Sequence, residues 1–221
     1  MAGMARVIVP GIPHHVTQRG VRSLGIFPGI DDRLDYLQLL KHHSGIHGLH
    51  FASYAFMDNH VHLVVIPERE DSLRRAVGEA HRLYTRRINF STGKRGYFFQ
   101  GRPFSCPLDD EYYFAALRYV ECNPVRAGLV RDPWDYLWSG ARYHVGLSAT
   151  DPLIDVDALS HWHLRPEKWR EMLRMEAAQI NVLRKKTLTG RPCGGEAFID
   201  RLEARAGRNL HPGKPGPRNR G

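Results

Sequence analysis

Apolar and polar residues follow two different periods along the first half of the chain. Short runs rich in β-branched and aromatic residues predict three strands, over residues 12–19, 49–57 and 61–66. Between the first two strands, apolar residues recur at helical spacing from Asp31 and Asp32 to about residue 47, just before Gly48. Turn residues at 58–59 join the second and third strands, so these strands are predicted to form a hairpin.

A second helix is predicted to start near Ser72. Its apolar residues lie at helical spacing: Leu73, Val77, Ala80, Tyr84 and Ile88. Residues 93–101 predict a loop or a short final strand, and the acidic residues 109–111 open a third helix over 112–122. The order β-α-β-β-α-β, followed by a helix, indicates an α+β protein with a ferredoxin-like sheet and two helices on one face.

The pattern changes after about residue 143. Apolar spacing predicts one helix over residues 166–183 and a shorter one over 196–206. Residues 211–221 are rich in Pro, Gly and basic residues and are predicted to be a disordered basic tail. We therefore expect a main domain over residues 1–143, a helical extension over 144–210 and a tail over 211–221.

The charge balance favours a polyanionic partner. The chain has 32 Lys and Arg against 23 Asp and Glu, a net charge of +9, which favours nucleic acid first and an anionic membrane second. Its three cysteines are scattered without a C-x-x-C pair, which argues against a disulfide framework or a thiolate zinc site. No apolar run has the length of a membrane helix or a signal peptide, so we expect a cytoplasmic protein.

His60 and His62 are the first candidates for chemistry. Alternate residues of a strand face the same way, so their Cα atoms are expected roughly 6.6 Å apart, a spacing at which two imidazoles can bind one metal ion. The motif alone is weak, because 13 histidines give about one such pair by chance. A second pair, His161 and His163, lacks strand-forming neighbours, and His60 and His62 themselves remain either metal ligands or ordinary strand residues.

Tyr119 and Asn123 are the second pair of candidates. Residues four apart share a helix face, and Pro124 predicts a helix boundary at Asn123. The structural alternative is a core tyrosine and a helix stop. A free tyrosine has a pKa of about 10 and is a poor nucleophile, and a divalent metal on a phosphate offsets this deficit. A metal site with a facing tyrosine indicates a covalent protein–DNA intermediate, whereas a metal site alone indicates hydrolysis by water.

Several segments resemble those of one family. Residues 54–65, Tyr-Ala-Phe-Met-Asp-Asn-His-Val-His-Leu-Val-Val, resemble the HUH strand of single-tyrosine transposases. Residues 118–130, Arg-Tyr-Val-Glu-Cys-Asn-Pro-Val-Arg-Ala-Gly-Leu-Val, resemble their tyrosine helix in the version found in REP-associated tyrosine transposases. Further similar blocks occur in the family's order at 14–20, 97–102 and 134–141. Residues 189–198 resemble the tail segment of longer members, which makes the extension a candidate DNA-binding element.

The resemblance implies a single-tyrosine HUH nuclease over residues 1–143. His60 and His62 match the metal-binding histidines, Tyr119 the nucleophile and Asn123 the residue that completes the metal site. The implied ion is Mg²⁺ or Mn²⁺, and the implied products are a 5′-phosphotyrosine and a free 3′-hydroxyl, formed without ATP. The implied substrate is a single-stranded DNA hairpin of a REP-like repeat, which places the protein at the nucleoid. A monomer and a homodimer both remain open.

Six arginines are candidate phosphate contacts: Arg75, Arg82 and Arg86 on the second helix, with Arg19, Arg102 and Arg126. Tyr97, Phe98 and Phe99 are candidates for stacking on unpaired bases, or else core residues. A hairpin-binding protein with little catalysis is the main alternative function, and the intact set of four site residues argues against it. A zinc-dependent deaminase needs a Cys pair and a His-x-Glu, and neither occurs.

Overall fold

One four-stranded antiparallel sheet forms the centre of the molecule. The computed structural model describes residues 6–155, 164–175 and 179–211. The sheet order is β2-β3-β1-β4, so the β1-α1-β2 and β3-α2-β4 units interleave as in a ferredoxin-like fold. This confirms the predicted α+β class and element order. The strands are β1 His14–Arg19, β2 Leu49–Phe56, β3 His60–Pro67 and β4 Phe104–Pro107.

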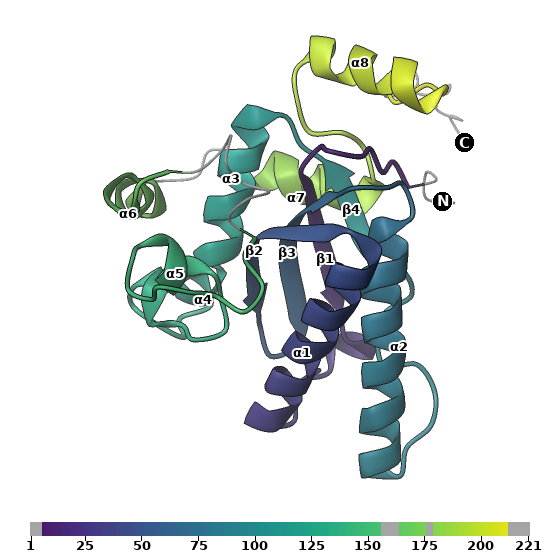
Figure 1. Ribbon diagram of the computed structural model, residues 1–221, viewed down its shortest axis with the longest axis vertical. Helices are drawn as coiled ribbons and strands as arrows, with labels where there is room; N and C mark the ends of the chain where they lie inside the picture. Colours follow the sequence, from purple (N-terminus) through teal and green to yellow (C-terminus); the bar gives the residue numbers. More distant parts are fainter. Residues whose placement is uncertain (1–5, 156–163, 176–178, 212–221) are drawn as a thin grey trace, which may run out of the picture.

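Two long helices cover one face of the sheet. These are α1 Ile30–His47 and α2 Ser72–Thr92, which pack against each other in front of the strands in Figure 1. The five apolar residues predicted on the second helix are all buried. Gly48 ends α1 with a left-handed backbone, φ 60°, a conformation that favours glycine.

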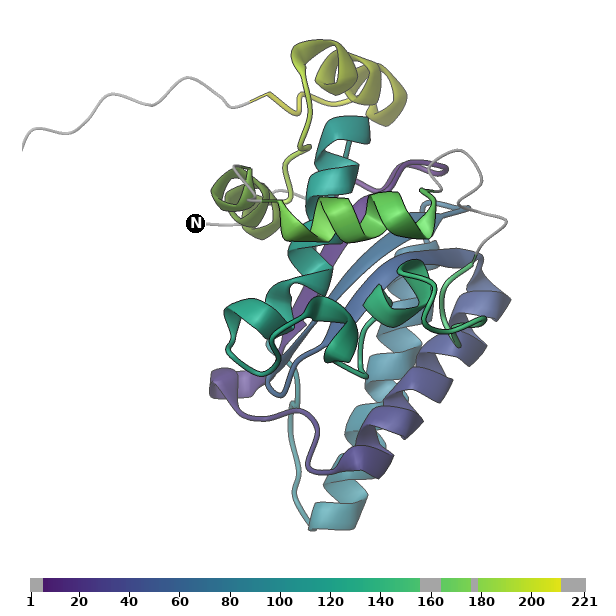
Figure 2. The ribbon, with the colours of Figure 1, turned by 90° about the vertical axis from the view of Figure 1, so that its left-hand side faces the viewer.

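The opposite face is covered by helices from the second half of the chain. α3, Asp110–Glu121, packs on β2 and β3, and α7, Ile180–Thr189, packs on β4 and beside α3. Figure 2 shows α7 crossing this face next to α3. The shorter helices are η1 Val21–Ser23, α4 Asn123–Arg126, η2 Pro133–Asp135, α5 Ala141–His144 and α6 Pro166–Arg174.

Residues 93–101 were predicted to be either a loop or a short final strand, and the loop is correct. The final strand, β4, begins later, at Phe104. Residues 93–101 form the loop after α2, with only an isolated bridge between Phe99 and Gly20. Gly93, Gly96 and Gly101 have positive φ angles, which break an extended run. The strand that pairs with β1 is β4.

The predicted single helix over residues 166–183 is wrong. α6 ends at Arg174, Met175 has an extended backbone, and α7 starts at Ile180. Trp169 is buried against His144 near α5, whereas α7 is seated on β4. One straight helix cannot serve both packing sites, so tertiary packing overrides the local helical pattern.

The last described helix matches its prediction. α8, Glu196–Ala206, packs with the start of the chain in a small second apolar cluster that contains Val7, Val9 and Phe198. Residues 212–221 of the predicted tail, and the pair His161 and His163, lie outside the described residues. Within the described ranges, no helix is both long enough and apolar enough to cross a membrane.

Candidate functional site

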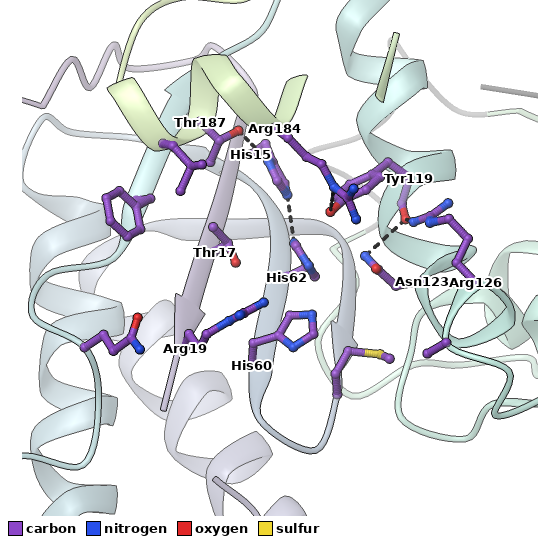
Figure 3. A pocket seen from close by; sticks show the side chains of 15 residues that line it. His15, Thr17, Arg19, His60, His62, Tyr119, Asn123, Arg126, Arg184 and Thr187 are labelled. Carbon is purple, nitrogen blue, oxygen red and sulfur yellow. Dashed lines mark hydrogen bonds between the residues drawn. The ribbon is translucent and has the colours of Figure 1, made fainter. Parts of the chain in front are cut away.

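A cavity of about 480 Å³ opens on the sheet face that α3 and α7 cover. It brings together all four predicted site residues, although they come from two separate parts of the chain (Figure 3). Its lining includes His60 and His62 of β3, Tyr119 of α3, Asn123 and Arg126 of α4, Arg19 and His15 of β1, and Arg184 and Thr187 of α7.

His60 and His62 lie on the same face of β3, as the strand alternation predicts, with ring centroids 4.9 Å apart. Each ring makes its hydrogen bond through Nδ1. His60 Nδ1 lies 2.6 Å from Oδ1 of Asn59, and His62 Nδ1 lies 3.1 Å from Nε2 of His15. Nε2 of each ring is therefore the nitrogen that can bind a metal ion in the cavity.

A chain of hydrogen bonds fixes which nitrogen of His62 carries the proton. The Thr187 hydroxyl donates to the carbonyl of Leu183 at 2.8 Å, so its oxygen accepts from Nδ1–H of His15 at 2.8 Å. With the His15 proton on Nδ1, Nε2 of His15 then accepts from Nδ1–H of His62. This arrangement leaves the lone pair on Nε2 of His62, and such a supporting bond orients metal-binding histidines.

Burial keeps both candidate ligands neutral. Burial, with the nearby charges of Arg19 and Arg184, lowers the pKa of His60 to about 4. Burial, followed by the neighbouring His15 and His60 rings, lowers the pKa of His62 well below its ordinary value. Both imidazoles are therefore uncharged at neutral pH, which is the form that binds metal ions.

Tyr119 sits in the last turn of α3 and is only 3% exposed. Its ring lies nearly perpendicular to that of His62, with an interplanar angle of 87° and centroids 5.1 Å apart. Its phenolic oxygen accepts a hydrogen bond from Nε–H of Arg184 at 3.0 Å, and the Arg126 guanidinium lies 4.5 Å from the ring centroid. The tyrosine is thus held between two cations beside the histidine pair.

Asn123 begins a new short helix directly after α3, which confirms the predicted helix boundary. Cys122, between the two helices, has φ −84° and ψ 0°. The buried Asn123 side chain donates from Nδ2 to the carbonyl of Tyr119 at 3.2 Å, and Arg126 donates to the same carbonyl. The Asn123 Oδ1 atom is therefore left as the oxygen that this side chain can offer in the cavity.

Glu121 anchors the tyrosine helix and was not found from the sequence. Its fully buried carboxylate accepts from Ser53 at 2.7 Å and from Trp169 at 2.8 Å, and lies 2.6 Å from Nδ1 of His144. These partners come from β2, α5 and α6, so no local spacing signals them. The network fixes the helix that carries Tyr119.

The six predicted DNA-binding arginines fall into three places. Arg19 and Arg126 line the cavity. Arg102 lines an adjoining cavity of about 290 Å³, which shares Gln100 and Phe104 with the first. The other three lie on α2, across the sheet from the cavity: Arg75, which pairs with Asp71, Arg82, which pairs with Glu79, and Arg86.

The three predicted stacking aromatics also separate. Tyr97 is 91% exposed, whereas Phe99 is buried and stacks on His81 with centroids 4.1 Å apart. Phe98 packs partly buried against the core. Phe99 is therefore a core residue, and Tyr97 is the aromatic that remains available to a base.

A second group of possible metal ligands lies on and after α8. Single oxygen or nitrogen atoms of Asp200, Glu203 and His211 lie within 4.8 Å of one another. Glu203 accepts from the backbone N–H groups of Leu210 and His211 at 2.5 and 3.0 Å. These hydrogen bonds explain the arrangement, because they hold the chain that follows α8 against that helix. None of the three residues lines the cavity.

Among the cavity residues that were not predicted from the sequence, His15, Arg184 and Thr187 make hydrogen bonds that bear on the site. His15 and Thr187 are 172 positions apart, so no motif spacing relates them. The only signal for His15 was its place in the first predicted strand, within the similar block at residues 14–20. No feature of the α7 sequence indicated a role for Arg184 or Thr187.

No protein-family model and no curated protein matches the chain. Among solved structures, it is similar to the REP-associated tyrosine transposase bound to a REP hairpin. The two are 15% identical, with a TM-score of 0.54, over 72% of this chain and 93% of that one. The chain therefore has the mixed α+β fold of a REP-associated tyrosine transposase.

Proposed function

We propose that this protein nicks and rejoins single-stranded DNA at hairpin-forming, REP-like repeats, with Tyr119 as the nucleophile. One observation carries the proposal: the Tyr119 ring meets His62 in a cavity that also holds His60 and Asn123. A tyrosine beside two neutral histidines and an amide is a donor set for metal-assisted attack on a phosphate. The structural neighbour is bound to a REP hairpin, which supports the substrate class.

The cavity residues fit a divalent ion. Nε2 of His60, Nε2 of His62 and Oδ1 of Asn123 offer two nitrogens and one oxygen, and water and phosphate oxygen would complete the shell. We propose Mg²⁺ or Mn²⁺. When bound, the ion would polarise the scissile phosphate and offset the charge of the transition state. Asp200, Glu203 and His211 are not proposed as ligands, because their hydrogen bonds already explain their arrangement.

The reaction is a transesterification, in which one phosphate ester bond is exchanged for another. The phenolic oxygen of Tyr119 attacks the phosphorus, the bond from phosphorus to the 3′-oxygen breaks, and the phenol gives up its proton while the 3′-oxygen gains one. The 5′-phosphate is then linked to Tyr119. Attack by a 3′-hydroxyl reverses the exchange, so rejoining needs no ATP because the linkage conserves the energy of the broken bond.

Positive side chains surround the point of attack. Arg19, Arg126 and Arg184 line the cavity, and charge of this sign favours a phosphate backbone. The cavity is the size of a small-molecule site, which suits an unpaired nucleotide better than a duplex. This contrast supports a single-stranded substrate. Arg102 in the adjoining cavity extends the basic surface away from Tyr119.

One observation favours a second candidate function, a hairpin-binding protein with little catalysis. Tyr119 is 3% exposed, and its hydroxyl already bonds Arg184. A binding protein would keep the basic surface without needing access to the phenol. The two functions differ in whether DNA becomes covalently attached.

The test uses the full chain with end-labelled hairpins from the DNA flanking its own gene, on both strands, with and without Mn²⁺. We expect a band of protein-linked DNA on a denaturing gel that requires the metal and is lost in Tyr119→Phe. Tyr143→Phe, the same change at a partly buried tyrosine outside the cavity, serves as the matched control. Binding without any adduct from any hairpin would instead establish the second function, and an adduct that survives in Tyr119→Phe would exclude this nucleophile.

A further inference from the structure

We propose that Arg184 of α7 is a catalytic residue, which holds the phenolic oxygen of Tyr119 and stabilises the charge that develops there. The inference deepens the proposed nicking reaction and rests on it. It makes α7, which lies beyond the predicted nuclease domain, part of the active site.

The Arg184 side chain is aimed at the reacting atom. Its Nε–H donates to the phenolic oxygen of Tyr119 at 3.0 Å, and its guanidinium lies 5.4 Å from the ring centroid (Figure 3). Among the described residues, no carboxylate forms an ion pair with Arg184. Its positive charge is therefore available to the site, and an arginine fork has further N–H groups for phosphate oxygens.

α7 is fixed in place by its own buried contacts. Leu183 is fully buried, and Thr187 bonds both the ring of His15 and the thiol of Cys106, at 2.8 and 3.2 Å. Arg184 and Thr187 are three positions apart on one helix, so they project toward the same side. The same turn of α7 therefore supports the histidine pair and places the Arg184 guanidinium on the nucleophile.

The chemistry needs a donor at this position in both directions. During attack, negative charge spreads over the phosphoryl oxygens close to the phenolic oxygen. During rejoining, the bond from phosphorus to that oxygen breaks, and the phenolic oxygen takes the electron pair. A fixed charged N–H donor at 3.0 Å stabilises both states. Arg126 is placed differently, because it donates to the backbone carbonyl of Tyr119 and lies over its ring.

The experiment compares Arg184→Ala with Lys185→Ala, a neighbouring exposed change on the same helix, in the full chain with Mn²⁺ and hairpin DNA. We expect Arg184→Ala to slow adduct formation at saturating DNA by about 100-fold. The Kd for DNA should change by no more than about fivefold, because Arg19, Arg126 and Arg102 of the basic surface remain in the variant. Added guanidinium ion should restore part of the rate in Arg184→Ala. The rate of Arg184→Lys should lie between those of Arg184→Ala and the unchanged protein.

The outcomes separate this inference from the proposed function. If the unchanged protein forms no adduct with any hairpin, the proposed function fails and takes the inference with it. If it forms the adduct and Arg184→Ala matches Lys185→Ala at saturating DNA, the inference alone is overturned. A weaker Kd with an unchanged rate also overturns it, because Arg184 would then only bind the DNA backbone.

Discussion

Nε2 of His15 lies 3.1 Å from Nδ1 of His62, although the two residues are 47 positions apart. Thr187 orients the ring of His15 through a hydrogen bond, and His15 in turn orients the ring of His62, the candidate metal ligand. We expect His15→Ala to raise the Mn²⁺ concentration needed for half-maximal adduct formation by about 10- to 100-fold. The measurement is a Mn²⁺ titration at saturating DNA.

Thr187→Val provides the matched change, because it removes the hydroxyl and keeps the shape. It should shift the Mn²⁺ requirement in the same direction by a smaller factor, since His15 itself remains. An unchanged Mn²⁺ requirement in His15→Ala would show that the hydrogen bond to His62 has no part in metal binding.

Stability should fall as the pH drops from about 6.5 to about 4. Burial lowers the pKa of His14 to about 4 and that of His81 to about 3. In this window the unfolded chain binds protons at these histidines and the folded chain does not, so acid favours unfolding. His50, whose pKa is raised beside Asp155 and Glu68, acts in the opposite direction but is less buried. Melting temperatures across this range measure the effect, and a flat or rising profile toward pH 4 would contradict it.

Glu121→Ala should strongly destabilise the protein. It leaves the buried donors of Ser53 and Trp169 without their acceptor, and it removes the partner of His144. We expect a loss of about 3 kcal/mol or more in the free energy of unfolding, measured with urea. Glu79→Ala removes an exposed ion pair with Arg82 and should cost less than about 1 kcal/mol. Equal losses in the two variants would show that the Glu121 network does not anchor α3.

The candidate DNA-binding arginines should divide by the face on which they lie. Joint replacement of Arg75, Arg82 and Arg86 by Gln should weaken hairpin binding and reduce its salt dependence, with an unchanged rate at saturating DNA. Arg19→Gln should lower that rate as well, because Arg19 lines the cavity. Single-turnover rates with binding isotherms at two salt concentrations separate these effects. A slower rate at saturating DNA in the triple variant would contradict the division.

Local periodicity predicts those parts of the site that lie within one element. His60 and His62 share a face because strands alternate, and Tyr119 and Asn123 share one because helices repeat every 3.6 residues. The sheet brings these two pairs together, since α3 packs on the strand that carries the histidines.

The remaining parts depend on packing between distant segments. Arg184 bonds a residue 65 positions away, and Glu121 binds partners from three other elements. The apolar spacing of residues 166–183 fits one helix, and only the separate packing sites of Trp169 and α7 require two. Spacing along a single sequence carries no record of such contacts. The predicted helix over residues 166–183 therefore reached only the start of α7, and α7 was not predicted as a wall of the cavity.

The most direct measurement is the identity of the residue that becomes linked to DNA. The adduct formed with Mn²⁺ and a flanking hairpin is digested with nuclease and trypsin, which cuts after Arg118 and Arg126 and releases residues 119–126. We expect mass spectrometry to find the remaining nucleotide on Tyr119 in this peptide. A nucleotide on any other residue, or cleaved DNA with no modified peptide, would contradict the assignment of Tyr119 as the nucleophile.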